Sequence, residues 1–351
     1  MRVVVVNAGL GGVVVGAHRA GAQVAAALEA DATLVAGLRA NLEGHDLPCE
    51  DVAILELRDD ATAARRLAAA LEAHPPADDL HVHVSVPPDK AAVEAARVRE
   101  ALACLGARGD ASWSIVAKVS PETRRVLVDA SAREPARVAF DLLDSAALGA
   151  PQARQRLVAG PPELLHAMHV RRAATTRRGS VREALEASGL TLPSEHLKNQ
   201  TRSTNTAAPC TRSVDAAAYT LCGSHALTWC DAKGKTVRLM SPREGAVLMG
   251  LPGDWALPEG RREAQRAVGG ATCALLGEVL TRAAQDARRA ASGGGGGGGG
   301  VGSGVGSDAL LAVLGGSPEP PFAMNKKQYR TLKRRLSALE LALETIANAK
   351  R

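Results

Sequence analysis

Residues 149–160 read Gly-Ala-Pro-Gln-Ala-Arg-Gln-Arg-Leu-Val-Ala-Gly. The glycine and proline at the start predict a turn, and the apolar residues 157–159 predict a strand that follows it. Arg154 and Arg156 are two positions apart, so a strand places both side chains on one face. Their planar guanidinium groups suit the oxygens of a phosphate or of a base carbonyl. The alternative is an arginine-rich strand edge without a ligand.

The amino terminus has the pattern of a nucleotide-binding unit. Residues 3–6 are four valines, which predict a strand buried on both faces, and residues 7–12 form a glycine-rich turn before a helix that ends near residue 20. A second strand, residues 23–28, runs into Glu29 and Asp31, which place a carboxylate where a ribose hydroxyl can be held. This pattern predicts a cofactor at the carboxyl edge of a parallel sheet, although many nucleotide-binding proteins share it.

Two later segments are also patterned. Residues 238–252 read Arg-Leu-Met-Ser-Pro-Arg-Glu-Gly-Ala-Val-Leu-Met-Gly-Leu-Pro. They predict a helix that begins after Ser241, with Glu244 as a capping carboxylate, and ends at Gly250. Residues 264–271, Ala-Gln-Arg-Ala-Val-Gly-Gly-Ala, precede a predicted helix that reaches about Arg289. A capped helix is expected from Ser180, within an interval of weak periodicity.

Taken in order, these segments resemble the DNA cytosine-5 methyltransferase family. Residues 149–156 have the Gly-x-Pro-Gln-x-Arg-x-Arg form of its motif VIII, and residues 238–252 closely resemble its motif IX. Residues 7–12, residues 29–31 and the pair Asp51-Val52 resemble motifs I to III, and residues 264–271 resemble motif X. The resemblance extends from Met1 to about Arg289.

The resemblance implies an α/β fold, a doubly wound Rossmann-like domain that depends on S-adenosylmethionine, with a smaller recognition domain inserted. The implied divisions are a cofactor-binding and catalytic-type domain over 1–162, a recognition-like domain over 163–237, and a segment over 238–291 that returns to the first domain. A glycine-rich linker over 292–323 and a basic, heptad-patterned helix over 324–351 follow.

The resemblance also implies a site for S-adenosylmethionine. Its residues are Ala8, Gly9, Leu10, Gly11, Gly12, Glu29, Asp51, Val52, Gly269 and Gly270. Asn7 stands where the family has an aromatic residue, and Gly270 stands where it has an asparagine. We therefore expect cofactor binding that is weakened but detectable.

The catalytic motifs of the family are only partly retained. Gln152, Arg154 and Arg156 match the residues that contact the target base and the nucleic-acid backbone. The family's nucleophilic cysteine falls on Pro88 or Asp89, and its catalytic glutamate falls on Ala117. These losses favour a catalytically degenerate methyltransferase-like protein. The alternatives are an active enzyme with a displaced nucleophile, and a scaffold that binds neither ligand.

Charge and composition indicate the partners. The formal net charge is +6, and the eight basic and two acidic residues of 325–351 account for the whole excess. Arginines at 171, 172, 177, 178 and 182 form a local basic cluster, interpreted either as a solvated face or as a contact to a phosphate backbone. We expect DNA as a partner, and self-association through the apolar seam of residues 329–346.

Other features point away from special chemistry. No apolar run is long enough to span a membrane, and the amino terminus lacks a secretory pattern, so an intracellular protein is expected. Cys222, His225 and Cys230 lack a Cys-x-x-Cys pair, so no metal site is predicted. His81 and His83 alternate along a predicted strand, where we expect them on its surface. Asp89 is the expected cap of the helix that follows.

Overall fold

The computed structural model describes residues 1–54, 68, 71–77, 79–87, 89–109, 112–175, 178–199 and 211–292. The chain divides into two compact units, Met1–Gly295 and Gly296–Arg351, and every described residue lies in the first. The predicted basic helix, nearly all of the predicted linker and Pro88 lie outside the described residues. No helix in the described part of the chain is long and apolar enough to cross a membrane.

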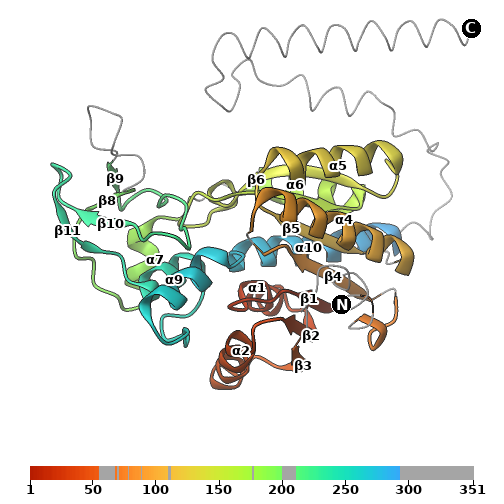
Figure 1. Cartoon of the computed structure of the whole chain (residues 1–351), viewed down its shortest axis with the longest axis horizontal. Coiled ribbons are helices and arrows are strands. Elements are labelled where there is room, and N and C mark those ends of the chain that lie inside the picture. The colour runs from red at the N-terminus through yellow and green to blue at the C-terminus, as the bar shows by residue number, and fades with distance from the viewer. Residues whose placement is uncertain are drawn as a thin grey trace, which may run out of the picture. The chain divides into compact units, whose positions relative to one another are not determined.

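A seven-stranded sheet forms the centre of the first unit (Figure 1). Its spatial order is β3-β2-β1-β4-β5-β7-β6, and β7 runs opposite to the other six strands. The strands are β1 (Arg2–Val6), β2 (Gln23–Glu29), β3 (Cys49–Ile54), β4 (Leu80–Ser85), β5 (Trp113–Ala117), β6 (Ala139–Asp144) and β7 (Gln155–Gly160). From β1 the strands follow one another outward to β3 at one edge of the sheet, and from β4 they extend in the opposite direction to β6 at the other edge. The predicted doubly wound α/β fold is therefore confirmed.

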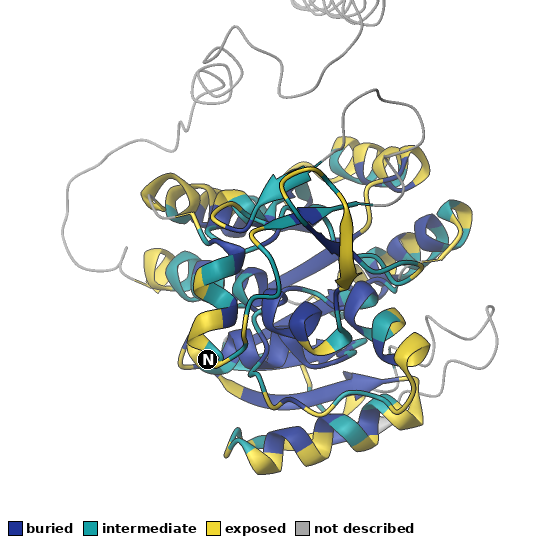
Figure 2. Ribbon diagram, turned by 90° about the vertical axis from the view of Figure 1, so that its left-hand side faces the viewer, coloured by how far each residue is buried: buried dark blue, intermediate teal, exposed yellow. Residues whose placement is uncertain are grey.

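Helices cover both faces of this sheet because successive residues of a buried strand point to opposite sides. Val3 and Val5 pack with α1 (Gly12–Arg19), α2 (Ala32–Gly44), α6 (Pro162–Ala174) and α10 (Ala274–Ser292). Val4 and Val6 pack on the other face with α4 (Ala91–Arg108) and α5 (Pro121–Arg133). Figure 2 shows the result, in which buried strands lie between helices whose outer faces are exposed.

A second, four-stranded antiparallel sheet lies at the left of Figure 1. Its order is β11-β10-β8-β9, from β8 (His196–Lys198), β9 (Thr211–Ser213), β10 (Thr228–Cys230) and β11 (Thr236–Leu239). Trp229 at its centre is fully buried. The short helices α7 (Val181–Ala187), α8 (Pro242–Leu248) and α9 (Arg261–Gly270) belong to the same part of the chain. Helix α6, in contrast, packs on α10 and on β6 and β7 of the large sheet.

The local predictions have mixed outcomes. Ser180 and Ser241 cap their helices as predicted, and Ser241 forms a reciprocal capping box with Glu244. The predicted cap at Asp89 is wrong, because the residue that precedes α4 is Lys90, and the Asp89 carboxylate accepts a hydrogen bond from the backbone N–H of Lys90 instead. Residues 264–271, predicted to precede a helix, mostly form α9 themselves.

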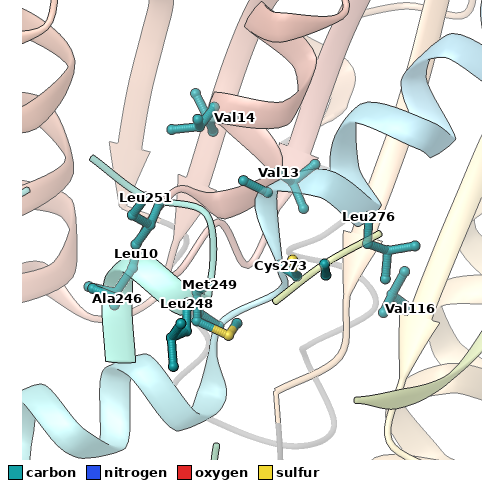
Figure 3. Packing of buried hydrophobic residues seen from close by; sticks show 14 of the residues in the cluster. Leu10, Val13, Val14, Val116, Ala246, Leu248, Met249, Leu251, Cys273 and Leu276 are labelled. Carbon is teal, nitrogen blue, oxygen red and sulfur yellow. The ribbon is translucent and has the colours of Figure 1, made fainter. Parts of the chain in front are cut away.

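Helix α10 passes very close to α1. A Cβ added to Gly12 would lie 1.9 Å from the carbonyl oxygen of Thr272, and one added to Gly16 would lie 2.3 Å from that of Ala274. On the opposing helix, a Cβ at Gly277 would lie 2.7 Å from the Cα of Val13. Figure 3 shows Val13 and Leu276 in the apolar cluster around this crossing. Only hydrogen at these three glycines permits so close an approach.

We predict that Gly16→Ala destabilises the fold by about 1–3 kcal/mol or more, because the new methyl group meets backbone atoms that cannot rotate away. Gly106→Ala is the matched control. Gly106 lies on an exposed position of α4, and a Cβ added to it would have nothing within 4 Å, so alanine there should add about 0.5–1 kcal/mol through helix propensity. Urea unfolding measures both. Equal stability of the two variants would contradict the close crossing.

Candidate functional site

A cavity of about 800 Å³ opens beyond the carboxyl ends of β1 and β4. These neighbouring strands are where the strand order reverses, which is the place where doubly wound sheets bind ligands. The walls come from the turn after β1, the start of α2, the end of β4 and the segment 256–272. Trp255 anchors that last segment, because its indole N–H donates to the carbonyl of Leu10 at 2.9 Å.

Glu29 organises the turn after β1. Its Oε2 accepts a hydrogen bond from the backbone N–H of Gly9 at 2.7 Å, and its Oε1 accepts from those of Ala30 at 2.8 Å and Asp31 at 3.1 Å. Gly9 and Gly11 have φ angles of 57° and 85°, which favour glycine. The carboxylate has about four acceptor positions, so three backbone donors leave it able to accept one more hydrogen bond on the cavity side.

Asn7 contributes an unsatisfied polar atom to the cavity wall. It has a φ of 55°, and its Nδ2 donates to the carbonyl of Ser85 at 2.8 Å, which joins the ends of β1 and β4. Its Oδ1 is buried and has no hydrogen-bond partner among the described residues. A buried acceptor without a partner is costly, so this oxygen favours a ligand that brings a donor.

The predicted cofactor residues separate into three groups. Leu10, Glu29 and Gly270 line the cavity. The second group shapes the turn. Ala8 donates its N–H to the carbonyl of Leu28, Gly9 adopts a positive φ, and Gly11 and Gly12 permit close packing on Leu38 and Thr272.

Asp51, Val52 and Gly269 do not line the cavity. Asp51 pairs with Ala26, three positions before Glu29 at the end of β2, so it lies back along the sheet and borders a separate hollow together with Val52. Gly269 packs instead on the backbone of Cys222 and Gly223. The structure therefore does not bring the expected motif III carboxylate to the cavity.

Two of the three motif VIII side chains are buried and bonded to backbone. Gln152 is fully buried, and its Nε2 donates to the carbonyl of Leu248 and to the sulfur of Met249. The guanidinium of Arg154 donates to the carbonyl of Leu221 at 2.7 Å and to that of Gly269 at 2.6 Å. Burial lowers the pKa of Arg154 to about 10, so it stays charged at neutral pH. In this arrangement both side chains connect chain segments and neither is open to a nucleic acid.

Arg156 is the half-buried member of the three. Its Nη1 donates to the carbonyl of Gln155 at 2.9 Å. Burial lowers the pKa of Arg156, the nearby charge of Arg154 lowers it further, and Glu94 acts in the opposite direction. Glu94 is fully buried, and its Oε2 has no hydrogen-bond partner among the described residues. The Glu94 carboxylate and the Arg156 guanidinium are thus close enough for their charges to interact.

Of the positions expected for catalytic groups, the structure describes Asp89 and Ala117. Asp89 is exposed and pairs with Arg97, with 3.2 Å between Oδ2 and Nη2. Ala117 is buried at the end of β5, opposite Leu157. Burial raises the pKa of the Cys49 thiol to about 11 and also raises the pKa values of Cys230 and Cys273. None of these three thiols is activated as a thiolate.

The basic cluster is largely paired with carboxylates. Arg171 donates to Asp286 at 2.6 Å, and Arg172 lies 3.8 Å from Asp141. Arg182 binds Asp215 at 2.7 Å and also binds Glu195. These three arginines therefore behave as a solvated, ion-paired face rather than as a free phosphate-binding stripe. Arg177 lies outside the described residues. No group of three or more ionisable or thiol side chains in the described ranges is arranged to hold a metal ion.

His81 and His83 correct a sequence-based prediction. We expected them on the strand surface, yet both are buried, with 1% of each exposed. Helices α1 and α10 cover the face of the sheet to which they point, and serines of β4 and of the β5 segment bond to their ring nitrogens. Burial lowers the pKa of His81 to about 4 and that of His83 to about 3, with His81 adding to the shift of its neighbour. The serines alternating at 112 and 114 were the signal for this arrangement.

The fold is that of solved methyltransferase structures. A protein described as a DNA modification methyltransferase encoded within a prophage of E. coli matches with a TM-score of 0.53 and 14% identity, over 82% of this chain and 99% of that one. The Dnmt2 methyltransferase of S. pombe has the same TM-score and coverage at 15% identity. A variant of the Spodoptera frugiperda DNMT2 matches with a TM-score of 0.53 and 11% identity, over 81% of this chain and 99% of that one. Comparison of the sequence with protein-family models and with curated proteins gives no match.

We predict that the two buried histidines make stability fall with acidification. Because their pKa values in the folded chain lie below the ordinary value of about 6.5, the unfolded chain takes up protons first as the pH falls. The pair should therefore lower the free energy of unfolding by about 3 kcal/mol between pH 6.5 and pH 5.

The double variant H81Q/H83Q is the control, since glutamine hydrogen-bonds but does not titrate. Urea unfolding at several pH values should give the control a shallower fall in stability over this range. Parallel curves for the two proteins would contradict the burial of neutral imidazoles.

Proposed function

We propose that this chain is a DNA cytosine-5 methyltransferase-like protein that retains a site for S-adenosylmethionine and has lost catalysis. The observation that carries the proposal is the cavity at the reversal of strand order, with Glu29 and Asn7 in its walls and no cysteine among the described residues that line it. The matching fold of the three methyltransferase structures supports it.

The residues of the cavity fit the cofactor. Its volume lies in the range of about 300–1,000 Å³ that is usual for small-molecule sites. The remaining acceptor position of Glu29 suits a ribose hydroxyl, and the unpaired Oδ1 of Asn7 suits an N–H or O–H donor. Leu10, Leu34 and Leu257 give the cavity apolar walls. When bound, S-adenosylmethionine supplies an electrophilic methyl group.

The loss of catalysis follows from the chemistry of cytosine. Carbon 5 of the ring is a poor nucleophile until a thiolate adds to carbon 6, and Asp89 is a far weaker nucleophile than a thiolate. Ala117 provides no proton donor for the ring nitrogen. Without the nucleophile and the proton donor, the protein can bind its ligands but cannot transfer the methyl group to cytosine. We propose that DNA remains the partner, and that binding by the body requires rearrangement of the ion pairs that now occupy Arg171, Arg172 and Arg182.

Isothermal titration calorimetry tests the cofactor site. We predict measurable binding of S-adenosylmethionine by the full chain and affinity lower by about 10–100-fold in Glu29→Gln, because a hydrogen bond to a charged acceptor contributes about 1.5–3 kcal/mol. Glu50→Gln is the control, since Glu50 is exposed and borders the separate hollow near Asp51. No heat and no thermal shift at millimolar cofactor would exclude the site and favour the scaffold alternative.

A second candidate is an active enzyme with Cys222 as a displaced nucleophile. The carbonyl of Leu221, the residue before it, accepts from Arg154, so Cys222 stands beside the motif VIII arginines. It is half-buried, unlike Cys230 and Cys273.

Transfer of a labelled methyl group to cytosine-containing DNA distinguishes the two candidates. We predict no incorporation by the full chain, because no activated thiolate lies at the family position. Incorporation that Cys222→Ser abolishes, and that Cys49→Ser leaves intact, would establish the second candidate instead.

A further inference from the structure

Six side chains form one continuous hydrogen-bonded chain beneath α10. Ser112 Oγ lies 2.8 Å from His81 Nδ1, His81 Nε2 lies 3.0 Å from Ser114 Oγ, and Ser114 Oγ lies 2.8 Å from His83 Nδ1. His83 Nε2 then lies 3.0 Å from Ser85 Oγ, which lies 3.0 Å from Thr272 Oγ1. This hydrogen-bonded chain begins at Ser112 beside β5, alternates between β4 and β5, and ends at Thr272 on the segment before α10.

The far end of this chain forms part of the cavity wall. Ser85 and Thr272 both line the cavity, and Thr272 is only half-buried. The middle of the chain is sealed, since Ser114 is fully buried and His81 and His83 are almost so. In the described part of the protein, Ser114, His81 and His83 form side-chain hydrogen bonds only with other members of this hydrogen-bonded chain. Reversing the donor and acceptor roles at one end of this hydrogen-bonded chain therefore requires the same reversal along its whole length.

The balance of donors and acceptors allows two orders. A neutral imidazole has one donor and one acceptor nitrogen, and a hydroxyl has one proton. Ser114 bonds to both rings, so it donates to one and accepts from the other. If His83 is protonated on Nε2, then His81 must be as well, and if one ring carries its proton on Nδ1 the other does too. Mixed tautomers leave a buried polar group without a partner, which costs about 1–3 kcal/mol.

We propose that His81 and His83 are positioning residues whose shared tautomer sets whether the wall of the cofactor site donates or accepts. With both rings protonated on Nε2, His83 donates to Ser85 and Ser85 donates to Thr272, which leaves the hydroxyl of Thr272 free to donate to an acceptor group such as a carboxylate. With both rings protonated on Nδ1, Thr272 donates to Ser85 and offers the ligand only its oxygen. The link to S-adenosylmethionine rests on the proposed function, whereas the coupling itself does not.

Two conservative variants should drive the tautomers in opposite directions. Thr272→Val removes the acceptor of the Ser85 proton, so Ser85 must donate to His83 Nε2. A ring that accepts on Nε2 carries its own proton on Nδ1, so both rings become Nδ1-protonated. Ser112→Ala removes the acceptor for His81 Nδ1, so both rings become Nε2-protonated. Long-range ¹H–¹⁵N correlation spectra of the full chain read both tautomers directly, and thermal melting confirms that each variant is folded.

The same tautomer on both rings in every protein, with opposite results for Thr272→Val and Ser112→Ala, is the expected outcome. Unlike tautomers within one protein, or the same tautomer in both variants, would overturn the coupling. Calorimetry of Thr272→Val should show affinity for S-adenosylmethionine lower by about tenfold, the equivalent of about 1.4 kcal/mol. Unchanged affinity would show that the hydrogen-bonded chain does not influence cofactor binding. Absence of binding by the unaltered protein would refute the proposed function but would not affect the tautomer result.

Discussion

Helix α10 contacts α1 through backbone atoms, at Gly12, Gly16 and Gly277. This contact brings the last described part of the chain onto the first βα unit. The residues immediately before α10, from Gly270 to Thr272, become a wall of the cavity. Gly269, the residue before them, provides a carbonyl to which Arg154 donates. The cavity therefore depends on contacts between segments more than 200 positions apart, rather than on the glycine-rich turn alone.

The retained and the lost motif residues differ in what the fold requires of them. Arg154 joins the chain near Leu221 to that near Gly269, and Gln152 joins the strand entrance to the end of α8. Replacing either would leave buried carbonyls or donors unpaired, which costs stability whether or not the protein catalyses anything. Among the described residues, Ala117 and Asp89, in contrast, join no distant segments of the chain, because the Asp89 carboxylate bonds only to the nearby Lys90 and Arg97 and Ala117 has no polar side chain. This difference agrees with our proposal that the fold persists after loss of the chemistry.

Much of the fold could be predicted from the sequence because its signals are local. Four consecutive valines indicate a strand buried on both faces, and Ser241 with Glu244 indicates a capped helix start. The sequence predicts the candidate site less well than the fold. Alternation places His81 and His83 on one face, but it does not reveal that α1 and α10 cover that face. Likewise, the motif resemblance suggests Asp51 as a ligand, whereas its position depends on the register of β3 against β2. Burial of Arg154 is a tertiary effect that spacing cannot show.

Covalent trapping tests the central claim, that a cofactor site persists without a nucleophile, most directly. The full chain is incubated with S-adenosylmethionine and with duplex DNA containing 5-fluorocytosine, at DNA concentrations where anisotropy shows saturation, and its intact mass is then measured. An active cytosine-5 methyltransferase serves as the positive control. Our account predicts an unchanged protein mass. A stable adduct with the mass of the DNA strand, mapped to Cys222 or to any other cysteine of this chain, would contradict it.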